Sequence, residues 1–384
     1  MLSKKAHVLQ SFLCVLAACA AAKLAHGQDL LIGQVSSQTS PVTAMNAKGL
    51  YAGINVYFEH INAQGGINGR KVKLVNKDDQ LVPAKMIELT KEFAADKNVV
   101  ALAAYQNTAG ITALAKENTV GSLGLALIAP FQGDRSIVSA KGFYPFRTGY
   151  PDEVAAMVKE AVFQQKKRVA IVYQSATFGP SMLKLVKELA AQEKLNIVAE
   201  IVVETAVADK VDASVKAGVE AAAKANPDAV FLLMGGRAAP MSASLLRSSA
   251  AADAQIYGMS ILPSAEVYKA AGDKARGIVL TQAVPFPYSA TLPVVSQYQK
   301  LMKQYAPNEP LSFTTLEGFI AGKITVEALK RAGPNPTREK VLKALDGMGQ
   351  YDLGGVYVDY SPKARNGWGS VDLTIIGANG KLLR

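Results

Sequence analysis

Cysteine and histidine are nearly missing from most of this 384-residue sequence. Cys14, Cys19, His7 and His26 all lie within the first 27 residues, which leaves His60 as the one histidine of the remaining chain. A zinc site, a thiol nucleophile or a Ser-His-Asp triad is hard to assemble without these side chains. The sequence therefore argues against an enzyme and against a metal site, and His60 is expected on the surface of a helix.

Phosphate-binding glycine patterns and clustered basic runs are also missing. Neither G-x-G-x-x-G nor a Walker pattern occurs, so no nucleotide cofactor is expected. The net charge of +11 is spread along the chain without basic runs or interleaved aromatic residues. Such a distribution is typical of a basic soluble surface and not of a nucleic-acid interface.

The first 27 residues have the pattern of a secretory signal. Lys4 and Lys5 precede an apolar run over residues 8–22, which is too short to span a bilayer. Ala25-His26-Gly27 offers small residues for cleavage, so the mature chain is expected to begin near Gln28. The mature domains then contain no cysteine, and the fold must rely on its core without a disulfide.

A lipid anchor is the alternative to simple cleavage. Leu16-Ala17-Ala18-Cys19 has the form of the acceptor box of bacterial lipoproteins, in which the cysteine carries the lipid. The segment after Cys19 still has the form of a normal signal end, which favours cleavage near Gly27.

A helix, a glycine turn and a strand are predicted between Lys48 and Asp79. Gly65-Gly66 should end the helix, because glycine adopts the left-handed conformation at little cost. A short strand over residues 71–75 follows the turn. Apolar residues at helical spacing place one face of the helix, which begins near Ala47, against a sheet: Leu50, Ile54, Tyr57, Phe58 and Ile61.

Strands and helices alternate along the rest of the chain. Strands are predicted over 30–35, 99–104, 125–129, 168–173, 197–203, 228–234, 255–258 and 277–281, with a β-rich end from Gly355. Helices are predicted over 83–95, 109–118, 152–165, 180–194, 209–225, 237–251, 264–271, 293–305, 315–331 and 337–345. This alternation indicates an α/β fold with doubly wound parallel sheets, and the length indicates two domains.

Ligands of open parallel sheets bind beyond the carboxyl ends of the strands, where helix N-termini and free loop amides converge. This rule selects the loops that follow the predicted strands, among them residues 36–38, 78–79, 105–108 and 131–133 on one wall and 174–178, 235–237 and 259–260 on the other. We expect the following residues to contact a ligand, the aromatic ones through apolar surface and the others through hydrogen bonds: Tyr105, Asn107, Thr108, Phe131, Gln132, Gly133, Phe178, Arg237 and Ser260.

Several of these signals have a purely structural alternative. Asp78-Asp79 at a strand end are more often turn and cap residues than metal ligands. Arg237 can form a surface ion pair or contact a ligand. Phe131 and Phe178 can line a crevice or stack on a ligand.

The segment 61–71 (INAQGGINGRK), followed by Asp78-Asp79, resembles the periplasmic substrate-binding proteins of ABC transporters of the branched-chain amino-acid type. Ile128-Ala129-Pro130, Phe178-Gly179 and Gly235-Gly236 support the resemblance, which covers nearly all of the mature chain. It implies two Rossmann-like lobes joined by three crossovers, as in a type I periplasmic binding protein, that close on a solute like a hinged clamp.

The resemblance also implies the domain boundaries and the partners. Crossovers are expected near residues 146–150, 278–283 and 351–355. Lobe 1 then comprises residues 28–147 and 282–352, and lobe 2 residues 148–281 and 353–384, after a signal over residues 1–27. The expected setting is the Gram-negative periplasm, with a small-molecule ligand, a membrane permease as partner, a monomeric state, and neither cofactor nor nucleic acid.

The family's carboxylate-binding positions map to Asn107, Thr108 and the backbone of 131–133, with two departures. Gly133 stands where a threonine is usual, and Phe178 lacks the phenol oxygen that is often present.

Two further departures concern the second lobe. Arg237 stands in place of an aromatic residue, and Ser260 in place of the acid that receives the α-ammonium group of an amino acid. A buried ammonium without an opposing carboxylate costs several kcal/mol. We therefore expect a small organic acid, with an aromatic acid as one candidate, in place of a plain branched-chain amino acid. A sensor subunit for a receptor kinase or chemoreceptor is the alternative function.

Overall fold

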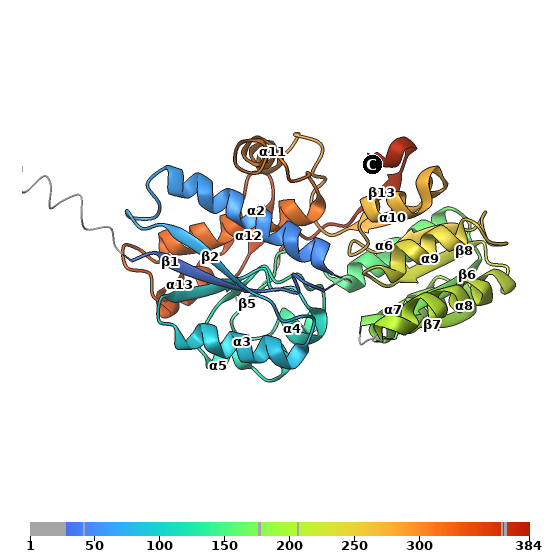
Figure 1. Ribbon diagram of the computed structural model, residues 1–384, viewed down its shortest axis with the longest axis horizontal. Helices are drawn as coiled ribbons and strands as arrows, with labels where there is room; N and C mark the ends of the chain where they lie inside the picture. Colours follow the sequence, from blue (N-terminus) through green and yellow to red (C-terminus); the bar gives the residue numbers. More distant parts are fainter. Residues whose placement is uncertain (1–27, 41–42, 176–177, 206, 362–363, 365–366) are drawn as a thin grey trace, which may run out of the picture.

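A computed structural model describes residues 28–40, 43–175, 178–205, 207–361, 364 and 367–384. The predicted signal, its cleavage site and the lipid-anchor position Cys19 lie outside these residues. Two lobes lie side by side along the long axis of the molecule (Figure 1). None of the helices in the described ranges is long and apolar enough to cross a membrane.

The first lobe is built on a five-stranded parallel sheet in the order β2-β1-β3-β4-β5. The strands are β1 (Leu30–Val35), β2 (Val72–Lys77), β3 (Val99–Ala103), β4 (Leu127–Ile128) and β5 (Phe143–Tyr144). One face packs against α2 (Ala44–Ala63), α11 (Pro293–Tyr305), α12 (Phe313–Arg331) and α13 (Arg338–Asp346). The other face packs against α3 (Pro83–Ala95), α4 (Thr108–Lys116) and α5 (Thr119–Ser122).

The second lobe is built on a seven-stranded sheet in the order β14-β13-β10-β9-β8-β6-β7. The strands are β6 (Arg168–Gln174), β7 (Asn196–Val203), β8 (Ala229–Leu233), β9 (Gln255–Gly258), β10 (Val279–Gln282), β13 (Asp372–Ile376) and β14 (Leu382–Leu383). The strands from β6 to β10 are parallel, and β13 and β14 extend the sheet in antiparallel fashion. One face packs against α6 (Tyr150–Phe163) and α7 (Phe178–Gln192), the other against α8 (Val211–Lys224), α9 (Ala238–Leu246) and α10 (Ser264–Ala271).

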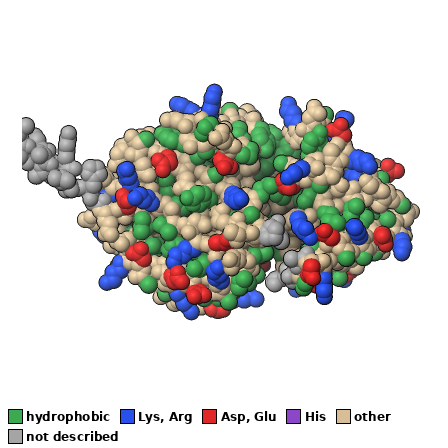
Figure 2. All heavy atoms as spheres, viewed as in Figure 1, with side chains coloured by type: hydrophobic (Ala, Val, Ile, Leu, Met, Phe, Trp, Pro, Cys, Tyr) green, Lys and Arg blue, Asp and Glu red, His purple; other side chains and the backbone are tan. Residues whose placement is uncertain are grey.

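Two doubly wound lobes confirm the predicted fold class. Short 3-10 turns complete the described elements: η1 (Arg135–Ile137), η2 (Ala208–Lys210), η3 (Gly272–Ala275) and η4 (Ala378–Gly380). Basic and acidic side chains are interspersed over both lobes on the face shown in Figure 2.

The helix α2 lies deep in the first lobe because glycines let it approach α12 closely. A Cβ at Gly53 would come within 2.0 Å of the Thr315 carbonyl oxygen, and one at Gly318 within 2.2 Å of the Leu50 carbonyl oxygen. After α2, Gly65 and Gly66 adopt φ of 97° and 73°, the left-handed conformation that the sequence predicted for this turn. His60 lies near the end of α2, half-buried, where its Nε2 is 3.0 Å from the Nε2 of Gln64.

The structure differs from the sequence-based prediction at several boundaries, most clearly at the end of one helix and near the last crossover. The helix predicted over 237–251 ends at Leu246, where the Arg247 guanidinium donates hydrogen bonds to the carbonyls of Ala252 and Ala254 and closes a turn. A hairpin of β11 (Gln350–Asp352) and β12 (Tyr357–Asp359) packs on the first lobe.

The position of this hairpin moves the last crossover. Leu353, Val356 and Tyr360 are buried in the core of the first lobe, so the chain returns to the second lobe after Tyr360 and not near 351–355. Residues 353–360 thus belong with lobe 1, against the predicted boundary. A short alternating segment does not reveal which of two cores receives its apolar side.

The three crossovers lie together between the lobes. The backbone N–H of Thr148 donates to the carbonyl of Ala283, and its hydroxyl lies within hydrogen-bond distance of the carbonyls of Trp368 and Ser370, to either of which it can donate. The N–H of Trp368 donates to the carbonyl of Phe146. These bonds tie the three connecting segments into one hinge.

Candidate functional site

A cleft of about 410 Å³ lies between the lobes, at the carboxyl ends of strands from both sheets. Its lining includes, from the first lobe, Thr43, Asn46, Asn107, Thr108 and Phe131 and, from the second lobe, Gln174, Phe178, Thr205, Gly235 and Arg237. Five of the nine predicted ligand-binding residues therefore line one cleft: Asn107, Thr108, Phe131, Phe178 and Arg237. Their roles in binding stay predictions.

Asn107 is held in place by the loop that precedes α4. Its side-chain oxygen accepts from the N–H of Gly110 and caps the helix, while its Nδ2 donates to Asp79 at 2.8 Å. Asp79 is fully buried and also accepts from the Ser37 hydroxyl at 2.6 Å and from the N–H of Leu81. These contacts make Asp79 a residue that fixes the loops of the first wall.

Arg237 lies at the second-lobe rim of the cleft, at the N-terminus of α9. It forms an ion pair of 2.6 Å with Asp212, and the two side chains are 48% and 54% exposed. The surface ion pair considered in the sequence therefore exists, and Arg237 lines the cleft as well. Among the described residues that line the cleft, Arg237 carries the one formal charge.

Four predicted residues lie outside the lining of this cleft. Tyr105 is buried in the core beneath α3, with its hydroxyl 3.4 Å from that of Thr90. The side chain of Tyr105 turns into the core because Tyr105 follows Ala104, whose φ of 46° is left-handed. A sequence pattern shows where a strand ends, but it does not show this reversal of side-chain direction.

Gln132 is held by the loop and helix next to it. Its side-chain amide donates hydrogen bonds to the Thr108 carbonyl and the Thr112 hydroxyl.

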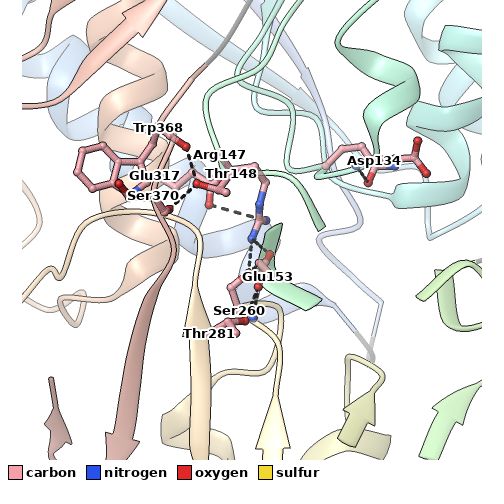
Figure 3. A network of polar contacts seen from close by, with 10 residues as sticks. Asp134, Arg147, Thr148, Glu153, Ser260, Thr281, Glu317, Trp368 and Ser370 are labelled. Carbon is pink, nitrogen blue, oxygen red and sulfur yellow. Dashed lines mark hydrogen bonds and ion pairs between the residues drawn. The ribbon is translucent and has the colours of Figure 1, made fainter. Parts of the chain in front are cut away.

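Gly133 and Ser260 also lie away from the cleft. Gly133 lines a second cavity of about 550 Å³ at the hinge, together with Gln132, Arg147 and Trp368. Ser260 belongs to a buried polar cluster that sequence reasoning missed (Figure 3). Its hydroxyl donates to Glu153 at 2.9 Å and accepts from Arg147 at 2.5 Å.

Arg147 is the centre of this buried cluster. Its guanidinium lies 3.9 Å from Glu153 of the second lobe and 3.9 Å from Glu317 of the first lobe, and all three side chains are at most 3% exposed. It also lies over the ring of Phe131, with 4.2 Å between Cζ and the ring centroid. The cluster joins the hinge, both lobes and one residue of the cleft.

Glu153 and Glu317 differ in their surroundings. The Glu153 carboxylate accepts hydrogen bonds from the N–H and hydroxyl of Ser260 and from the Thr281 hydroxyl. Burial raises the pKa of Glu317 to about 7, while the charge of Arg147 acts to lower it and that of Glu153 to raise it. One buried cation between two carboxylates leaves a surplus negative charge, which a proton on Glu317 removes.

The available sequence signal for this cluster was weak. Arg147 lies in a crossover between buried Phe146 and Tyr150, so an arginine within an apolar segment was the visible clue. Glu153 and Glu317 are on helices far apart in the chain, and no spacing rule connects them.

Comparison with known proteins gives a consistent result. A family described as "Periplasmic binding protein" matches residues 30–380. The "Leu/Ile/Val-binding protein homolog 1" of Brucella abortus (strain 2308) is 24% identical over 330 residues, which is 84% of each chain.

Two solved structures resemble this fold over most of the chain. A substrate-binding periplasmic protein from Ralstonia solanacearum matches with a TM-score of 0.86 and 29% identity, over 92% of this chain and 99% of that one. A fatty acid ABC transporter substrate-binding protein from Thermomonospora curvata matches with a TM-score of 0.80 and 21% identity, over 93% of this chain and 91% of that one.

Proposed function

The chain belongs to the periplasmic binding protein family, and from this premise we propose that it captures a small carboxylate-bearing solute by closure of the two lobes. The preferred ligand is an organic or aromatic acid, with an amino acid as the alternative. After removal of a signal peptide, the protein would work in the periplasm and deliver its ligand to the membrane permease of an ABC importer.

The charge of the cleft lining is the observation that supports this ligand class. Arg237 is cationic, and no acidic residue is found among the described lining residues. A carboxylate can pair with Arg237, whereas the ammonium group of an amino acid meets no opposing carboxylate in the lining. The rings of Phe131 and Phe178 supply apolar surface for the body of the ligand.

The placement of these residues on both walls supports closure of the lobes. Asn107 and Phe131 belong to the first lobe, and Phe178 and Arg237 to the second. A ligand that contacts both walls favours the state in which they are close together. The three adjacent crossovers provide the segment at which such a movement would occur.

Calorimetric titration of the purified mature protein tests the ligand class. Benzoate, phenylacetate and hexanoate are compared with leucine, isoleucine and valine. We expect binding of at least one acid, and a loss of about tenfold or more in its affinity in Arg237→Ala, because a charge-assisted hydrogen bond is removed.

Arg276→Ala removes an exposed arginine of the same lobe that is not among the lining residues and should leave affinity unchanged. Tight leucine binding that Arg237→Ala does not weaken would contradict the proposal.

A further inference from the structure

Tyr150 packs against residues of both the inter-lobe cleft and the hinge cavity. Tyr150 is the first residue of α6 and is 1% exposed. Its ring contacts that of Phe178 edge to face, with 5.0 Å between the centroids. Phe178 lines the cleft, so Tyr150 supports this part of the cleft wall from behind.

The other side of Tyr150 faces residues that line the hinge cavity. Its N–H donates to the Gly133 carbonyl at 2.7 Å, and the Arg147 guanidinium lies 5.9 Å from its ring centroid. Gly133, Arg147 and Gly149 all line the hinge cavity of about 550 Å³. Tyr150 thus contacts residues of two cavities whose described linings have no residue in common.

Gly133 shows how closely the ring fills this space. A Cβ at Gly133 would lie 2.7 Å from Cδ1 and 2.9 Å from Cε1 of Tyr150, closer than such atoms approach in proteins. The backbone N of Tyr150, at 2.9 Å, blocks the same position. A side chain at position 133 and the tyrosine ring at position 150 therefore compete for one volume.

We propose that Tyr150 is a specificity-determining residue that closes the inner end of the cleft and limits the length of the ligand. With the ring in place, a ligand is confined to the volume between Phe131, Phe178 and Arg237. A smaller residue at position 150 would join the cleft to the hinge cavity and admit a longer ligand. This inference rests on the proposed function for its choice of probes.

Ligand length is tested with benzoate and 4-phenylbutanoate, titrated by calorimetry into wild type, Tyr150→Leu and Tyr150→Ala. We expect the ratio of the two affinities to shift by about tenfold or more toward 4-phenylbutanoate in the variants, because additional apolar groups gain a cavity. Tyr150→Phe keeps the ring and should keep the ratio.

Tyr257→Leu is the matched control. Tyr257 is also fully buried in the second lobe and also contacts a phenylalanine edge to face, Phe231 at 5.4 Å. Unlike the partners of Tyr150, Phe231 and the hydrogen-bond partner Gln164 line neither cavity. An affinity ratio that shifts equally in Tyr257→Leu, or not at all in Tyr150→Leu and Tyr150→Ala, would overturn the proposal.

A second measurement needs no ligand. Gly133→Ala should lower the midpoint of thermal unfolding in wild type by several degrees more than in the Tyr150→Ala background, because the contacts with the ring are then gone and only the contact with the backbone N of residue 150 remains. An equal loss in both backgrounds would overturn the assignment of this volume to Tyr150.

The two tests separate this inference from the proposed function. If wild type binds neither benzoate nor 4-phenylbutanoate, the proposed ligand class is wrong. The affinity ratio is then measured with the free amino acids alanine and phenylalanine as the short and the long ligand. If no probe binds, the coupling between positions 133 and 150 alone decides for or against Tyr150 as the residue that fills this space.

Discussion

Arg147 and Arg237 both lie near the inter-lobe cleft, but the first is buried and the second is exposed. The Arg147 side chain is 1% exposed and lies between two buried carboxylates at the hinge. The Arg237 side chain is 48% exposed and pairs with one exposed acid at the rim. Removing a partner from a buried ion pair leaves an uncompensated charge in a poorly solvated place, whereas an exposed pair is screened by water. The first arginine therefore supports the architecture, and the second is the one that we propose to contact a ligand.

The largest effect is expected from Arg147→Met. The substitution keeps an apolar chain over Phe131 but leaves Glu153 and Glu317 without their cation, so we expect a loss of about 3–5 kcal/mol in the free energy of unfolding. Urea denaturation at neutral pH measures it. Arg237→Met, the exposed counterpart, should change the free energy of unfolding by less than about 1 kcal/mol.

A double variant sharpens the interpretation. Glu317→Gln removes one of the two stranded carboxylates, so Arg147→Met with Glu317→Gln should be more stable than Arg147→Met alone. Equal losses of stability in Arg147→Met and Arg237→Met would show that the buried cluster is no different from the surface pair.

The second prediction concerns the pH dependence of stability. The pKa of Glu317 is raised from 4.5 to about 7 in the folded protein, chiefly by burial. Between these values the folded state holds a proton that the unfolded state has released. The protonated Glu317 therefore stabilises the folded state fully below pH 4.5. This stabilisation, on the order of 3 kcal/mol, is lost as the pH rises through 7.

Glu317→Gln isolates this contribution, because an amide does not titrate. Urea denaturation of wild type and variant from pH 4.5 to 8 should give curves that diverge, with wild type falling relative to the variant as the pH rises. Parallel curves would contradict the assigned pKa. The half-exposed pair of Arg237 and Asp212 provides the comparison: Asp212→Asn should change the free energy of unfolding at neutral pH by less than about 1 kcal/mol.

The contrast between the two arginines also explains what the sequence could predict. Helical spacing and apolar strands located both lobes, and Pro83–Ala95, Gln255–Gly258, Ser264–Ala271 and Pro293–Tyr305 match the predicted bounds. The rule that ligands bind at the carboxyl ends of strands correctly placed Arg237 in the lining of the cleft, because that rule depends on chain order alone. These features are local or follow from topology.

The missed features depend on contacts between distant segments. Arg147 meets Glu317 and Ser260 across 170 and 113 residues of chain, and Tyr150 competes with Gly133 for one volume. The buried direction of the Tyr105 side chain depends on a single left-handed residue before it. No periodicity in the sequence encodes such pairings. The contacts of Arg147 at the hinge and the packing of Tyr150 against Gly133 could therefore be seen only in the structure.

The smallest effect is expected at the rim, where the proposed ligand would compete with Asp212 for Arg237. An exposed pair contributes about 0.2–1 kcal/mol, so Asp212→Asn should strengthen the binding of benzoate by no more than about fivefold and leave stability nearly unchanged. Calorimetry at low and at high salt measures the gain, which should shrink as salt screens the pair. Asp209→Asn removes an exposed acid from the 3-10 turn that precedes α8 and serves as the control. If both variants raise affinity equally, the gain comes from net charge and not from release of Arg237. A gain confined to Asp212→Asn would identify the rim arginine as the group that meets the carboxylate, in contrast to its buried counterpart at the hinge.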